Sequence, residues 1–258
     1  MLEKKKIGAK EIIRRIVFVI ALIVFIGSAY KLYSIWDEYN KNSTIYEELR
    51  EYSPEIVTDD SVESNDPNYK FNPEDYQKLL DINSDFKGWI TIPKTEVNYP
   101  IVQTIDNSYY LTHNFNKEEN DGGSIFIASE NKTPLEERNT IIHGHHMKDG
   151  SMFASLRNYK ETSFIDSNKK IYISTKDEVL VYEIFSVYVE QASSEPYKYS
   201  FASDEEYVNY LKSLNENSYT RIDTKEFTKD DKIITLSTCT YEVEDGRLLV
   251  HARLIGKQ

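Results

Sequence analysis

The chain has one cysteine, Cys239, among its 258 residues, and this scarcity excludes several kinds of protein. A single thiol cannot close an internal disulfide, and it cannot supply a zinc site built from several cysteines. Two interpretations of the residue remain open. It is either a small buried apolar side chain or a nucleophile that works with a histidine and a charged group from elsewhere in the chain.

Basic residues are also in deficit, because 31 Lys and Arg stand against 43 Asp and Glu and the net charge is -12. A chain with this excess of acidic residues is unsuited to binding the phosphate backbone of nucleic acids. We therefore expect no nucleic-acid partner. The sequence also lacks a glycine-rich phosphate loop, an internal repeat and a pair of carboxylates at a recognisable catalytic spacing. Its 40% hydrophobic and 13% aromatic residues are nevertheless enough to form a buried core.

The N-terminus has the opposite charge, and a long apolar run follows it. Residues 1–15 contain six Lys and Arg against two Glu, and residues 16–30 carry no charge. Fifteen residues at about 1.5 Å each are too short for a hydrocarbon core of about 30 Å. The apolar character resumes after Lys31, which can snorkel to the interface, and continues to Trp36. We therefore predict a transmembrane anchor over residues 16–36.

The positive residues before the span predict a single-pass protein of the cell membrane, with a cytoplasmic N-terminus and an extracytoplasmic body. A cleaved signal peptide is the alternative, since Gly27 and Ala29 offer small residues at a suitable spacing. Either arrangement puts Cys239 in an oxidising compartment, where a free thiol is a liability. Its presence there favours the functional interpretation.

The remaining chain divides into a stalk and a folded domain. Residues 37–71 are polar, with a helix expected over 37–52 and an acidic linker over 53–69. A short helix is expected after Asn72, which suits an N-cap, and it opens a domain of residues 72–258. Ser203 and Glu206 predict a capped helix over 203–217.

Short strands dominate this domain. Many such strands at this spacing predict a mainly β fold, a barrel or a sandwich, with peripheral helices. The expected strands cover residues 89–92, 99–102, 124–127, 140–142, 170–174, 179–189, 233–238 and 248–255.

Three segments carry side chains that are chemically able to take part in catalysis. Residues 139–147 read N-T-I-I-H-G-H-H-M, with three of the chain's five histidines at the end of an apolar strand. Residues 235–239 read T-L-S-T-C and end in the only cysteine, and Arg247 opens the last strand. If those last two strands pair as a hairpin, Cys239 and Arg247 share one end of the sheet. A thiolate nucleophile, an imidazole and a guanidinium form a coherent set for acyl transfer.

Other interpretations of these residues stay open. A histidine at a strand end is often only a hydrogen-bonded residue, and an arginine before a strand is often a solvated charge. The histidine run also resembles metal ligands, but no further ligand group is placed to complete such a site, so we expect no metal.

The motifs resemble those of the sortases, the membrane-anchored cysteine transpeptidases of Gram-positive bacteria, and in particular class B. The similarity rests on N-T-I-I-H-G-H-H-M-K-D-G-S-M-F, on C-T-Y-E-V-E-D-G-R-L-L-V-H-A-R-L, and on Y-P-I-V-Q-T-I-D-N-S-Y-Y-L followed by G-G-S-I-F. It covers residues 72–258 and implies a closed sortase-type β-barrel.

The resemblance implies a role for each matching residue. Cys239 would be the nucleophile, His145 the general acid and base, and Arg247 the oxyanion-stabilising group. Arg253 is a poorer match for that last role, because it lies inside the final strand.

The resemblance also implies a substrate-binding groove. The residues expected in it are Asn107, Leu111, His143 and Ser237. The family usually has tyrosine at the position of His143, so the substrate contact made there is in doubt.

The implied reaction is cleavage of a sorting signal after Thr through a thioacyl-enzyme intermediate, followed by transfer to the amine of a lipid-linked peptidoglycan precursor. No cofactor is required. The reaction needs a thiolate and a protonated imidazole together, which free pKa values of about 8.5 and about 6.5 disfavour unless Arg247 and the pocket shift the balance. The alternatives are a cysteine protease that uses water as acceptor and a non-catalytic anchored binding module.

Overall fold

The protein is described by a computed structural model that covers residues 8–57, 68–194, 196–220, 222, 224–240 and 244–258. The chain forms two compact units, Met1–Ser43 and Thr44–Gln258. Of the expected features, part of the basic segment 1–15 and the middle of the linker 53–69 lie outside the described residues.

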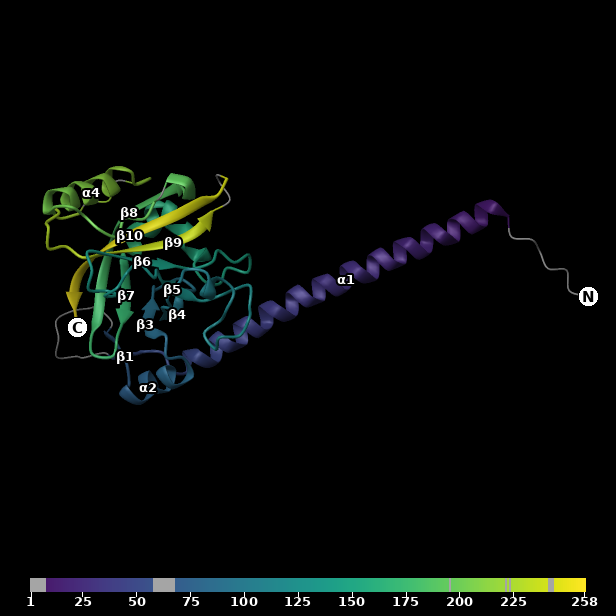
Figure 1. Ribbon diagram of the computed structural model, residues 1–258, viewed down its shortest axis with the longest axis horizontal. Coiled ribbons are helices and arrows are strands. Elements are labelled where there is room, and N and C mark those ends of the chain that lie inside the picture. Colours follow the sequence, from purple (N-terminus) through teal and green to yellow (C-terminus); the bar gives the residue numbers. More distant parts are fainter. Residues whose placement is uncertain (1–7, 58–67, 195, 221, 223, 241–243) are drawn as a thin grey trace, which may run out of the picture. The chain divides into compact units, whose positions relative to one another are not determined.

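Helix α1 (Ala9–Arg50) runs without interruption through the expected anchor and the expected stalk helix (Figure 1). It is the one helix among the described residues that is long and apolar enough to cross a membrane, with a mean hydropathy of 2.4 over its best window. Side chains such as Phe18, Phe25 and Trp36 are exposed along it. An exposed apolar stretch of this length fits a membrane anchor.

The second unit contains a closed barrel of eight strands in the order β10-β8-β7-β3-β4-β5-β6-β9. Neighbouring strands are antiparallel except for β4 with β5 and β6 with β9, which are parallel. The barrel strands are β3 (Phe86–Thr91), β4 (Asn98–Val102), β5 (Ile125–Ile127), β6 (Asn139–His143), β7 (Lys170–Ser174), β8 (Val179–Gln191), β9 (Ile233–Thr240) and β10 (Gly246–Lys257). The mainly β prediction is confirmed, and the barrel replaces the sandwich alternative.

The burial of the strands explains why the sheet closes into a barrel. Strand β6 is buried along most of its length, and so is β9, because each lies between two neighbours and beneath covering elements. The interior core includes Trp89, Ile101 and Leu236, none of which has measurable exposure. Closing the sheet leaves no unpaired central edge.

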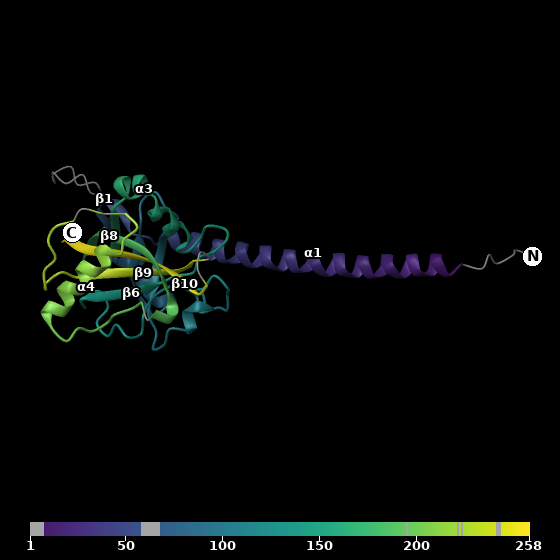
Figure 2. The ribbon, with the colours of Figure 1, turned by 90° about the horizontal axis from the view of Figure 1, so that it is seen from above.

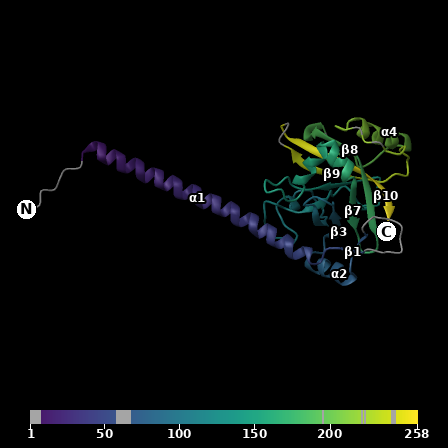
Figure 3. The same ribbon diagram turned by 180° about the vertical axis from the view of Figure 1, so that it is seen from behind.

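Short helices surround the barrel. They are α2 (Pro73–Ile82), η1 (Tyr109–Leu111), η2 (Ala154–Lys160), α3 (Thr162–Ser167), η3 (Ala192–Ser194) and α4 (Asp204–Glu216). The expected caps are present, because Asn72 accepts a hydrogen bond from the amide of Glu74, and Ser203 accepts one from the amide of Glu206. Figures 2 and 3 show α4 beside the sheet of β8, β9 and β10, where Tyr207 and Leu211 are buried.

The expected linker 53–69 is wrong at both of its ends. Strand β1 (Glu55–Val57) pairs antiparallel with β2 (Asn68–Lys70), so these segments form a two-stranded sheet. Tyr69 of β2 packs against Tyr172 of the barrel with a ring-centroid separation of 4.8 Å. This packing holds the segment against the barrel although its sequence is acidic and poor in apolar residues. The domain boundaries at residues 15, 36 and 71 stay predictions.

Candidate active site

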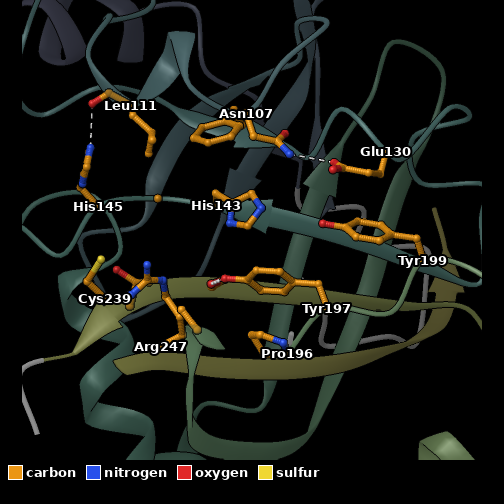
Figure 4. A pocket seen from close by; sticks show the side chains of 15 residues that line it. Asn107, Leu111, Glu130, His143, His145, Pro196, Tyr197, Tyr199, Cys239 and Arg247 are labelled. Atoms are coloured by element: carbon orange, nitrogen blue, oxygen red, sulfur yellow. Dashed lines mark hydrogen bonds between the residues drawn. The ribbon is translucent and has the colours of Figure 1, made fainter. Parts of the chain in front are cut away.

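The last two strands bring the expected nucleophile and its cation together. β9 and β10 pair antiparallel, and in their register Arg247 lies directly opposite Cys239. Residues opposite each other in an antiparallel pair project to the same face of the sheet. The predicted hairpin is therefore present, and the thiol and the guanidinium share one face at one end of it, as Figure 4 shows.

Cys239 is a free, partly exposed cysteine. Its electrostatic effect appears in the pKa of Arg247, the residue opposite it. Burial lowers the pKa of Arg247, but its electrostatic interactions with Cys239 and Asp245 raise it by more, so that this pKa lies above its ordinary value. Nη1 of Arg247 donates to the Asp245 carboxylate at 2.8 Å. The guanidinium is thus a permanent positive charge, held in position beside the thiol.

His145 follows β6 and lies at the same groove. Its Nε2 is 2.7 Å from the carbonyl oxygen of Leu111. A carbonyl oxygen only accepts, so Nε2 carries the proton in this arrangement. Between the described atoms of Cys239 and His145 no hydrogen bond is formed, and the Leu111 carbonyl is the partner of the imidazole (Figure 4).

The neighbouring histidine supports the nucleophile through the backbone. Nδ1 of His146 donates to the carbonyl oxygen of Cys239 at 3.0 Å. This bond ties the loop after β6 to the end of β9. His146 was not among the expected site residues, and its position next to His145 in the sequence was the only signal that could have indicated it.

The groove itself has a volume of about 740 Å³. It contains all seven of the site residues expected from the sequence, together with others that no motif indicated. Its lining is Asn107, Leu111, Phe126, Glu130, His143, Gly144, His145, Ala192, Pro196, Tyr197, Tyr199, Ser237, Thr238, Cys239 and Arg247.

His143 lies in the middle of the groove, at the position where the family usually has tyrosine. Burial lowers its pKa to about 4, the charge of Glu130 opposes this shift, and the charge of Arg247 adds to it. The side chain keeps part of its surface open to the groove, yet the protein around it removes enough water to keep the imidazole neutral. Its ring packs edge-on against Tyr197 at a centroid separation of 5.1 Å.

Three expected groove residues make contacts that fix the groove walls. Ser237, which is 2% exposed, shares a hydrogen bond of 2.7 Å with the hydroxyl of Tyr197. Asn107 donates to Glu130 at 2.8 Å and accepts from the amide of Ser129 at 2.7 Å. Leu111 supplies the carbonyl that binds His145.

Arg253 serves a different purpose from Arg247. It is 5% exposed, and its guanidinium donates to the carbonyl of Lys225 and to the hydroxyl of Thr224. It therefore holds the segment before β9 in place. In the part of the chain that the structure describes, no three His, Cys, Asp or Glu side chains are grouped so as to hold a metal ion.

The Tyr197 and Tyr199 side chains come from the segment between β8 and α4, far in sequence from the groove residues of β6 and β9. That segment has no motif of its own. Only the closed barrel brings it alongside β6 and β9, so the sequence contained no usable signal for these two residues.

Comparisons with known proteins identify the family of the chain. The family model described as the sortase domain matches residues 90–255. Sortase B of Listeria monocytogenes is 35% identical over 241 residues, which cover 92% of this chain and 95% of that protein.

Solved structures of sortase B proteins are similar over most of the chain. Sortase B from Bacillus anthracis in complex with AAEK1 has a TM-score of 0.72 and 37% identity, covering 85% of this chain and 99% of that one. A Staphylococcus aureus sortase B–substrate complex has a TM-score of 0.66 and 32% identity, covering 71% of this chain and 85% of that one. The chain therefore belongs to the sortase family of cysteine transpeptidases, and its relatives are sortase B proteins.

Proposed function

We propose that this protein cleaves the sorting signal of secreted surface proteins after Thr and transfers them to a cell-wall amine. The observation that carries the proposal is the register of the last two strands, which sets Arg247 opposite Cys239 in a groove that also contains His145. A thiol beside a fixed guanidinium and within one groove of an imidazole is suited to acyl transfer.

In the first half-reaction, the Cys239 thiolate attacks the carbonyl carbon of the Thr residue, and Arg247 stabilises the oxyanion that forms. The carbon–nitrogen bond then breaks, and the leaving amine takes a proton from the imidazolium form of His145, which becomes a neutral imidazole. For this step the imidazole turns from the Leu111 carbonyl, with which it shares its Nε2 proton at rest. The product is a thioacyl enzyme, with the peptide carbonyl carbon bonded to sulfur.

In the second half-reaction, an amine of the lipid-linked peptidoglycan precursor attacks the thioester. His145 accepts the proton that the amine loses, and the thiolate leaves as the carbon–sulfur bond breaks. The enzyme returns to its starting state with no cofactor consumed. Arg247 acts twice, because an oxyanion forms in each half-reaction.

The membrane placement is part of the proposal. Helix α1 anchors the protein with its N-terminus in the cytoplasm, and the catalytic domain lies outside. This places the groove on the side where surface proteins emerge and where lipid-linked precursors present their amines.

The test uses the full chain in detergent micelles with a library of pentapeptides that each contain Thr, with and without a glycine-type or diaminopimelate-type amine. Mass spectrometry should find a thioacyl adduct on Cys239 and, with amine present, a peptide–amine product. The Cys239→Ala variant is the matched control and should form neither. If only the hydrolysed peptide appears when amine is present, the protein is a protease and the proposal is wrong. If no adduct forms at all, the binding-module interpretation replaces it.

A further inference from the structure

The groove has an acidic end that the proposed reaction leaves unused. Glu130, which follows β5, lines the groove, and Figure 4 shows it on the opposite side of the labelled residues from Cys239. Figure 4 shows His143 between the two ends, where the charges of Glu130 and Arg247 shift its pKa in opposite directions. The groove therefore has a positive charge at its nucleophile end and a negative charge at the other.

The Glu130 carboxylate is held in a fixed position. Its Oε2 accepts a hydrogen bond from Asn107 Nδ2 at 2.8 Å and one from Ser129 Oγ at 3.3 Å. The bond from Asn107 is the main reason that the pKa of Glu130 lies below its ordinary value, so the group is ionised at neutral pH. Asn107 is itself held by the amide of Ser129. Both of these side-chain donors bind Oε2, so neither of them occupies Oε1.

Among the described residues, no side chain of opposite charge forms an ion pair with the Glu130 carboxylate. Within the described ranges, no Lys or Arg forms an ion pair with Glu130, and the nearby His143 is neutral because its pKa is about 4. Arg247 is paired with Asp245 at 2.8 Å. An ionised carboxylate that is fixed, partly open and unneutralised attracts a cation from solution.

An aromatic ring completes the surroundings. Tyr199 lines the same groove, and its pKa is raised by burial and by the charge of Glu130, so it is a neutral phenol near the carboxylate. An ammonium or guanidinium bound by a carboxylate gains further from the face of a neighbouring ring. The apolar stem of Lys or Arg also packs well on such a ring.

We propose that the Glu130 end of the groove selects sorting signals that carry a lysine or arginine at the residue lying over it. This inference rests on the proposed function, because it names the chemistry of the peptide which that function requires. An acceptor amine is also a cation, but it must reach the thioester at Cys239 and so enters at the opposite end. Glu130 is thus a specificity-determining residue, and Asn107 positions it.

The ion pair is partly exposed, so its effect is moderate. We expect a lysine peptide to exceed its glutamine counterpart by about 3–10-fold in kcat/KM at low ionic strength. Screening should shrink this ratio when salt is raised from about 0.05 M to about 0.5 M.

The experiment uses the full chain in detergent and peptides that differ only by Lys, Gln or Glu at each position before the Thr. Glu130→Gln keeps an oxygen for Asn107 but removes the charge, and Glu130→Lys reverses it. Glu216→Gln is the matched control, because it removes one negative charge at the end of α4, outside the groove. Turnover is followed by mass spectrometry. Binding is followed by fluorescence anisotropy in the same variants combined with Cys239→Ala.

The native chain and Glu216→Gln should prefer Lys at one position, Glu130→Gln should lose the preference, and Glu130→Lys should prefer Glu. Equal kcat/KM and equal binding for the three peptides would overturn this inference alone. Charge-selective binding without turnover of any peptide would overturn the proposed function and leave the selectivity in place. If Glu130→Gln raises the KM for the acceptor amine and leaves the peptide preference intact, the acidic end binds the acceptor and the inference is wrong.

Discussion

A buried histidine of the last strand makes the stability of the barrel sensitive to acid. His251 of β10 has no measurable exposure, and its Nδ1 is 2.9 Å from the hydroxyl of Thr235. That hydroxyl donates its only proton to Asn139 Oδ1, also at 2.9 Å. Nδ1 must therefore be the donor to Thr235, and the unprotonated Nε2 is buried without a hydrogen-bond partner.

A proton added to Nε2 would create a buried cation with no acceptor, and this burial lowers the pKa of His251 to about 3 from its ordinary 6.5. In acid, the unfolded chain therefore binds a proton that the folded chain does not. The contribution of His251 to stability is complete above pH 6.5 and is lost as the pH falls toward 3. Each pH unit in that window costs about 1.4 kcal/mol.

The assay is urea unfolding of the full chain in detergent micelles, followed by the fluorescence of the buried Trp89, at pH 7 and at pH 4.5. The comparison variant is His251→Gln, whose amide can still donate to Thr235 but does not titrate. Between these two pH values, the native chain should lose about 2–3 kcal/mol more stability than the variant. His143 also resists protonation, but it is present in both proteins and cancels in the difference. Equal losses in the two proteins would refute the reasoning.

Three further predictions concern the groove. Arg247→Gln should lower kcat/KM by about 100–1000-fold in the transfer assay, and Arg247→Lys should restore only part of it because a point charge lacks the planar fork. Tyr197→Phe should cost about 1 kcal/mol in urea unfolding, because the buried Ser237 hydroxyl loses its partner. Gly144→Ala should cost about 1–3 kcal/mol by the same measurement, since the new methyl would lie 2.7 Å from the Phe153 ring; an unchanged midpoint would contradict the close packing.

The strands could be predicted because their sequences alternate or stay apolar over short lengths. Residues 170–174 form β7 as expected, and the expected strands 233–238 and 248–255 form the cores of β9 and β10. The helix over 203–217 was predictable because Ser203 caps it and an apolar stripe follows. Each of these signals is local, so it needs no knowledge of the barrel.

The features that were missed depend on contacts between distant segments. β1 and β2 formed where the sequence predicted a linker, because Tyr69 packs on the barrel and the two segments pair with each other. Tyr199 and Glu130 are 69 positions apart and share the groove only after the barrel closes. Motif matching found the residues proposed for catalysis, but the acidic end of the groove belongs to no motif.

The orientation of His145 is likewise set by a backbone group that no sequence pattern reveals. The Leu111 carbonyl binds its imidazole, and the loop carrying that carbonyl passes close to Gly123. Gly123 has φ +57°, and a Cβ there would lie 2.4 Å from the carbonyl oxygen of Tyr110 and 2.9 Å from that of Leu111. Only glycine permits this approach without displacing the two carbonyls. The position of His145, the proposed acid–base group, therefore depends on Gly123, which lies 22 positions before it in the sequence. A side chain at residue 123 would displace the Leu111 carbonyl to which the His145 imidazole is bound.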